Sequence, residues 1–217
     1  MQQNFRFEIQ GEWDFGDLGA LTESFQLSYA YFYWLQKPPE SVPADLSSRF
    51  SRYFWSGEYI GDKFAEDLYW HIPEVDRIRL KSLHYNSPGW IEIAASVPVL
   101  AALAYCVRAW IATGDKAFDL FAKIDKYFID RKLRRIGKTI SLTEIGGDAI
   151  DEARALCFEL GKLLGLEKKN VESMITLTGN PISTLRLLVT LGKEARRVAT
   201  LQSKGKLTLP PPPQSGV

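Results

Sequence analysis

The sequence has few of the side chains on which protein chemistry most often depends. Its 217 residues include two cysteines and two histidines. Two histidines leave little choice of general base, and no Gly-x-Ser-x-Gly motif presents the exposed serine of a hydrolase. The sequence therefore favours a protein that is not an enzyme, although an enzyme without a recognisable motif stays open.

The scarcity of cysteine also bears on the compartment. Cys106 and Cys157 lie far apart in apolar stretches, and we expect both to be small buried side chains in a reducing environment. The N-terminus, residues 1–12, alternates polar and apolar residues and lacks the continuous apolar core of a secretory signal. These features favour a cytoplasmic protein.

The chain also has almost no excess of one sign of charge over the other. The 27 basic and 26 acidic residues give a net charge of +1, so attraction to nucleic acid or a membrane requires a local patch. One basic segment exists within residues 123–138. It comprises Lys123, Lys126, Arg131, Lys132, Arg134, Arg135 and Lys138. A solvated helix face is the simpler interpretation, and binding to nucleic acid or to an anionic membrane is the alternative.

A hydrophobic run long enough to cross a membrane is absent. The longest apolar stretch without a charge is Ile93–Val107, fifteen residues, and a spanning helix takes about 20. We predict a buried core helix over 90–112. Because Trp90 and Trp110 flank the stretch, a segment that inserts at the membrane interface is the alternative, with a peripheral membrane location.

The sequence contains fragments of cofactor and metal-binding motifs, but the neighbouring residues that each motif requires are missing. Gly137-Lys138-Thr139 resembles the end of a phosphate-binding loop, but Lys132 occupies the position of the required first glycine. One mixed set of residues could hold a metal, although its spacing matches no dedicated site. It comprises His71, Glu74, Asp76 and His84. We therefore expect neither a cofactor nor a metal.

Hydrophobic periodicity predicts two strands and a long helix in the first 90 residues. Residues 5–13 and 75–85 alternate as half-buried strands do, with Ile78 and Leu80 facing inward in the second. A helix capped by Asp14 or Asp17 runs between them to residue 36. Two strands alone form a marginal sheet, so a third strand, a covering helix or a partner subunit is needed.

The remainder of the chain reads as helices separated by glycine and proline. We predict a mainly helical α+β fold in which a small β-α-β-containing part, residues 1–89, packs against a C-terminal array of four to five helices, residues 90–208. A proline-rich tail, residues 209–217, follows. The two parts are expected to form one compact unit.

Aromatic residues are concentrated at the N-terminal end, where 20 of the 27 lie in the first 90 positions. Tyr31, Tyr33 and Trp34 are so close in the predicted helix that they cannot all face one core. They are candidates for an interface with a second copy or a protein partner. Alternatively, residues 40–70 fold over them and bury them within the chain.

These features lead to a hypothesis of function. The chain is expected to be a non-enzymatic interaction or assembly protein, either a homo-oligomer or a component that docks into a larger bacterial complex such as a defence or stress system. The main alternative is a membrane-acting effector that uses residues 90–112.

Overall fold

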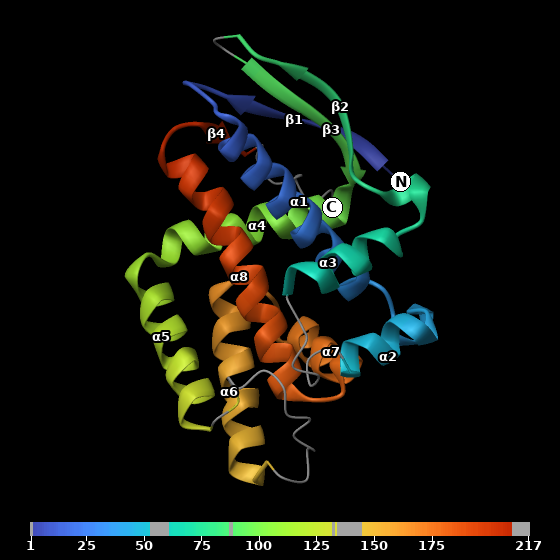
Figure 1. Cartoon of the computed structure of the whole chain (residues 1–217), viewed down its shortest axis with the longest axis vertical. Coiled ribbons are helices and arrows are strands. Elements are labelled where there is room, and N and C mark those ends of the chain that lie inside the picture. The colour runs from blue at the N-terminus through green and yellow to red at the C-terminus, as the bar shows by residue number, and fades with distance from the viewer. Residues whose placement is uncertain (1, 53–60, 87–88, 132, 134–144, 210–217) are drawn as a thin grey trace, which may run out of the picture.

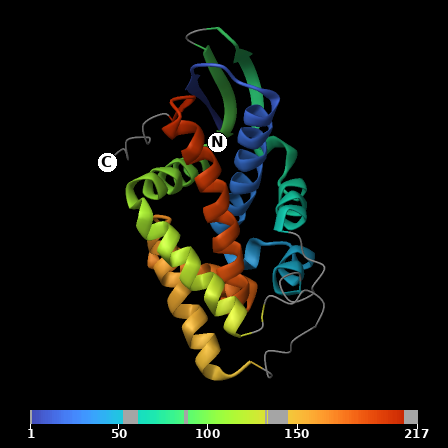
Figure 2. The same cartoon turned by 60° about the vertical axis from the view of Figure 1, so that its left-hand side comes forward.

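The fold is mainly helical, with a small sheet at one end of the elongated molecule (Figures 1 and 2). The computed structural model describes residues 2–52, 61–86, 89–131, 133 and 145–209. The predicted α+β class with a predominance of helix is confirmed.

The described residues form a four-stranded antiparallel sheet. Its strands are β1 (Gln2–Ile9), β2 (Arg79–His84), β3 (Gly89–Ser96) and β4 (Leu207–Thr208), in the spatial order β2-β3-β1-β4. β1 and β2 correspond to the two predicted strands: β1 begins and ends earlier than the predicted 5–13, and β2 is shorter than the predicted 75–85. Because β4 returns from the end of the chain to pair with β1, distant parts of the sequence share this sheet.

The prediction of a helix over residues 90–112 is wrong for its first part. Residues 89–96 form β3, which pairs with β1 along its whole length. Ile91 and Ile93 are buried and face the helices, whereas Trp90 and Glu92, which alternate with the two isoleucines, are only partly buried. The segment therefore has the two-residue period of a strand. The helix begins only at Val97, with a proline in its first turn. β3 is a third strand, which was one of the three ways in which the sheet was expected to be completed.

Eight helices are present among the described residues. They are α1 (Phe15–Leu35), α2 (Ala44–Arg52), α3 (Gly61–Trp70), α4 (Val97–Thr113), α5 (Asp115–Asp130), α6 (Gly147–Leu163), α7 (Lys168–Thr178) and α8 (Pro181–Ser203). Asp14 caps α1 by accepting a hydrogen bond from the Asp17 amide at 2.7 Å. Short 3-10 turns occur at Pro39–Ser41 and Glu74–Asp76.

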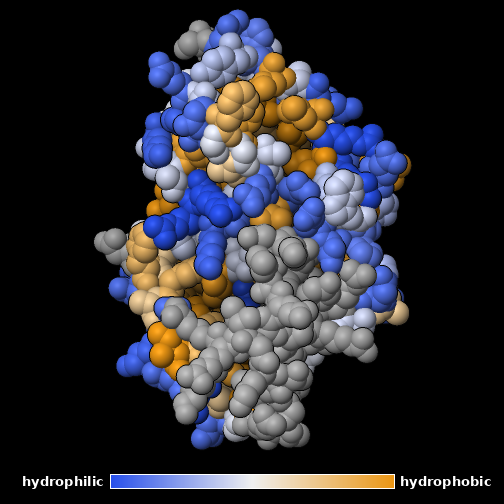
Figure 3. Space-filling model, in the orientation of Figure 1, coloured by the Kyte–Doolittle hydropathy of each residue, from blue (hydrophilic) through white to orange (hydrophobic). Residues whose placement is uncertain are grey.

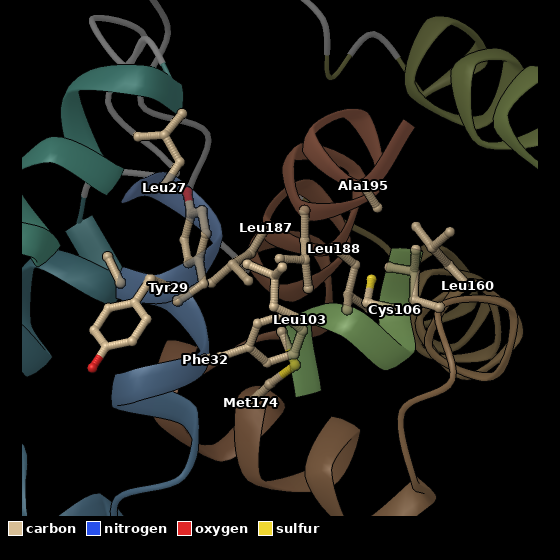
Figure 4. Close-up of a cluster of buried hydrophobic side chains, with 14 of the residues drawn as sticks. Leu27, Tyr29, Phe32, Leu103, Cys106, Leu160, Met174, Leu187, Leu188 and Ala195 are labelled. Atoms are coloured by element: carbon tan, nitrogen blue, oxygen red, sulfur yellow. The ribbon is translucent and has the colours of Figure 1, made fainter. Parts of the chain in front are cut away.

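The core is built around α1 and α8, which pack against each other along the middle of the molecule (Figures 1 and 2). Figure 4 shows Phe32 of α1, Leu103 of α4 and Leu188 of α8 in one apolar cluster. Leu103 is only 2% exposed, as predicted for a core residue. Cys106 and Cys157 are free and buried, as predicted, and burial raises the pKa of each thiol to about 12.

Candidate binding groove

The three aromatic residues predicted to form an interface lie inside the chain. Tyr31, Tyr33 and Trp34 are 1%, 6% and 4% exposed. The Trp34 indole donates to the Leu68 carbonyl of α3 at 2.9 Å, and the Tyr33 hydroxyl donates to the Asp76 carboxylate at 2.8 Å. α3 and the turn after it therefore cover this part of α1, and no partner can reach these side chains in this conformation.

The described part of the basic segment is partly neutralised. Lys123 pairs with Glu159 at 2.8 Å, and Arg131 pairs with Glu152 at 3.0 Å. Lys126 lies beside them along a shallow polar hollow between α5 and α6. The remaining candidates lie outside the described residues, together with the Gly137-Lys138-Thr139 motif. They are Lys132, Arg134, Arg135 and Lys138.

The two histidines are in separate contacts. The His71 ring lies 3.2 Å from the Asp45 carboxylate and 2.7 Å from the Asp67 carbonyl oxygen. The His84 ring stacks on Trp90 with the centroids 4.0 Å apart. Within the described ranges, no group of three or more His, Cys, Asp or Glu side chains could hold a metal ion.

The outer face of the sheet carries a three-layer stack. Trp90 of β3 has the Arg6 guanidinium of β1 3.9 Å from its ring centroid, and His84 of β2 stacks on it. Because β1 and β2 flank β3 on opposite sides, the two neighbours occupy both faces of the indole. A nucleic-acid base, which needs an open aromatic face, therefore has no stacking platform at Trp90.

The apolar stretch that followed Trp90 in the sequence faces inward. Val99, Leu100, Leu103 and Val107 of α4 are buried in the core. Among the residues that the structure covers, no single helix is long and apolar enough to cross a membrane. The bent pair Val97–Thr113 and Lys116–Asp130 passes that test only jointly, on length and composition.

Among the described residues, an open apolar groove lies between the first half of α1 and the inner face of the sheet at β2. It consists of two adjoining hollows of about 200 Å³ and 280 Å³. Both are bordered by Leu18, Leu83 and Ile91, so the hollows lie side by side. Figure 3 shows apolar side chains gathered on this upper part of the surface. We call it the α1–β2 groove.

The first hollow lies between α1 and the centre of the sheet. Its floor is Phe7, Phe25 and Ile93, and Leu80 and Tyr69 form its outer wall. Phe7 of β1 and Phe25 of α1 pack with ring centroids 5.2 Å apart, which fixes α1 over β1. The second hollow continues towards the start of α1. Its walls include Ile9, Trp13, Phe15, Leu83 and Tyr85.

Large apolar side chains along this groove are exposed to solvent. Leu80 and Leu83 lie opposite Ile93 and Ile91 in the sheet, on the inner face as predicted for Leu80. They nevertheless remain 64% and 44% exposed, because α1 packs over β1 and does not cover β2. Phe15, in the first turn of α1, is 94% exposed.

β2 is also an edge of the sheet. It pairs with β3 on one side, and no described strand pairs with its other side. Since successive backbone groups of a strand point to alternate sides, part of its N–H and C=O groups face outward. A bulge interrupts its register between Leu80 and Ser82. The edge therefore offers backbone donors and acceptors directly beside the apolar groove.

The same edge carries positive charge. The Arg79 guanidinium donates to the Glu74 carbonyl at 2.6 Å, and that of Arg77 donates to two backbone carbonyls. Lys81 is exposed at the bulge. In the part of the chain that the structure describes, none of these three cations forms an ion pair with a carboxylate.

No protein-family model, curated protein or solved structure matches this chain. The α1–β2 groove was also not predicted from the sequence. Its only signal there is the pair Leu80 and Leu83, which do not follow strict alternation and stand among basic residues. Functional inference therefore depends on the chemistry of the groove itself.

Proposed function

We propose that this chain is a non-enzymatic interaction protein that binds another polypeptide through the α1–β2 groove. The supporting observation is an apolar groove of two adjoining hollows beside a strand edge that no described strand pairs with. Leu80, Leu83 and Phe15 are exposed there. Covering apolar surface is worth roughly 25 cal/mol per Å², so a partner that buries these side chains gains free energy.

A polypeptide fits the groove better than a small molecule. Each hollow, at about 200 Å³ and 280 Å³, is smaller than the usual small-molecule pocket of ~300–1,000 Å³. The adjacent edge of β2 presents backbone donors and acceptors, which an extended peptide satisfies by pairing as a further strand. The groove and the edge together thus favour a chain that supplies both apolar side chains and a backbone.

The setting of this interaction is a further part of the proposal. Self-association and docking into a larger assembly, such as a bacterial defence or stress complex, both use a surface of this kind. A membrane-acting role would require α4 to withdraw Leu103 and its buried apolar neighbours from the core.

Site-specific photocrosslinking tests the proposed function. A photoreactive benzoylphenylalanine is placed at Leu83 in the groove and, as a control, at Phe118 of α5, which is similarly exposed at 48%. We expect adducts with a polypeptide from position 83 that are absent from position 118 and are suppressed by Leu80→Glu. The adduct mass distinguishes a second copy from another protein. Identical adduct patterns from both positions would contradict the proposal.

A further inference from the structure

We infer that the occupant of the α1–β2 groove is an extended segment of a partner protein, in which two apolar residues are flanked by acidic ones, and that it adds to β2 as a further strand. This inference rests on the proposed function and specifies its partner. It follows from three features of β2: the register of its two leucines, its charge and its bulge.

The register sets the spacing of the apolar residues. Leu80 and Leu83 lie opposite Ile93 and Ile91, two successive inward positions of β3. A strand added beside β2 places every second side chain on this inner face, with about 7 Å between them. Two large apolar residues, two positions apart, would therefore lie over Leu80 and Leu83 and enter the two hollows.

The charge selects the residues that flank them. Side chains that alternate with the apolar pair point to the outer face of the sheet, which is the face that Arg79 occupies, opposite Ala94. Arg79 and Lys81 have no carboxylate partner among the described residues. Carboxylates on the added strand would supply that partner, and opposite charges across neighbouring strands stabilise the pair.

The same residues disfavour a second copy of this chain as the occupant. Antiparallel pairing of β2 with itself places two basic strands side by side, and like charges across a strand pair are destabilising. Basic residues and a bulge are also the usual protection of an edge strand against self-pairing. An acidic segment meets no such repulsion, so the edge of β2 favours pairing with an acidic strand of another protein over pairing with a second copy of β2.

Peptide selection on the full-length protein tests the inference. Random ten-residue peptides are displayed and selected for binding, and the most enriched sequence is synthesised with a fluorescent label. We expect enriched peptides to share two large apolar residues two positions apart, flanked by Asp or Glu. Fluorescence polarisation should show affinity that weakens as salt rises, because the added contacts are charged.

Charge-reversal variants give the matched comparison. Lys81→Glu, alone and with Arg79→Glu, should weaken binding of the acidic peptide, by about tenfold for the double variant. The control Lys168→Glu plus Lys169→Glu makes the same charge change on exposed residues of α7, away from the sheet (Figure 1). It should leave the affinity within about twofold of the parent. Thermal melting checks that each variant is folded.

The outcomes separate the inference from the proposed function. Protection of β2 amides from hydrogen exchange on peptide binding supports strand addition, and its absence overturns it. Peptides that depend on Leu80 and Leu83 but lack carboxylates overturn the inference and keep the function. A parent dimer that Leu80→Ser plus Leu83→Ser dissociates does the same. If no peptide is enriched, or none depends on the two leucines, both the inference and the function fail.

Discussion

At the residue scale, Gly165 combines an unusual backbone conformation with close packing. Its φ is +74°, and a Cβ atom there would lie 2.2 Å from the Tyr105 ring. We predict that Gly165→Ala lowers the free energy of unfolding by about 2–3 kcal/mol, because strain at positive φ adds to a steric clash. Urea denaturation measures the loss.

Gly179 provides the control for that substitution. Its φ of +75° is nearly the same, but nothing lies within 4 Å of its added Cβ. Gly179→Ala should therefore show only the conformational part, about 1 kcal/mol. Adding Tyr105→Ala to Gly165→Ala should recover the steric part. Equal losses for the two alanine variants would show that Tyr105 moves aside without cost.

A buried carboxylate gives a prediction about pH. Glu194 of α8 is 2% exposed and accepts hydrogen bonds from Ser24 at 2.8 Å and Arg197 at 3.2 Å. Burial raises the pKa of Glu194 above its ordinary value of 4.5, although both hydrogen bonds oppose the shift. The folded state thus holds this proton more tightly than the unfolded state. Its contribution to stability is complete below pH 4.5 and is lost as the pH rises through the folded pKa.

Glu194→Gln should remove that loss and flatten the decline of stability between pH 4.5 and neutrality. The opposite case is Asp17, whose pKa is lowered by the hydrogen bond from Lys206. Asp17→Asn should remove stability that is present at neutral pH and disappears as the pH falls through the lowered pKa. Urea unfolding at a series of pH values measures both. Parallel profiles for parent and Glu194→Gln would contradict the assignment.

At the scale of elements, α4 shows which part of the apolar stretch belongs to the core. Leu103 is buried and Ile111, on the same helix, is 44% exposed. Leu103→Asp should cost several kcal/mol, because a buried unpaired charge is far more unfavourable than a lost apolar contact. Ile111→Asp should change stability by less than about 1 kcal/mol. A Leu103→Asp protein that melts near the parent temperature would favour the membrane-acting alternative.

The elements also show why local patterns predicted some segments and missed others. Asp14 as a helix cap was predictable, because capping depends on a few adjacent residues. β3 was missed because its alternation is short and continues directly into the apolar run of α4. Its pairing with β1 joins residues 80 or more positions apart, and a local pattern does not contain that information.

At the scale of the whole molecule, the groove results from where α1 packs on the sheet. The sequence correctly put Leu80 on the inner face of its strand, but its exposure depends on α1 lying over β1 and leaving β2 uncovered. Conversely, Tyr33 and Trp34 are buried because α3 and the following turn cover α1. Neither outcome follows from periodicity within one segment, so the interior aromatic residues, and not the groove, were predicted as the interface.

These two sets of residues give opposite expectations for the intact protein. Tyr31→Ser plus Trp34→Ser removes two large buried side chains and the hydrogen bond from Trp34 to Leu68. Deleting buried aromatic groups costs about 3–5 kcal/mol each, comparable with the whole stability of a domain. We therefore expect this variant to unfold and not to dissociate as a folded monomer.

Leu80→Ser plus Leu83→Ser changes exposed side chains only and should keep the parent circular dichroism and melting temperature. Light scattering after size exclusion then reports assembly for each variant. Folded, monomeric Tyr31→Ser plus Trp34→Ser from an oligomeric parent would place the interface on α1, against the position of these side chains in the core.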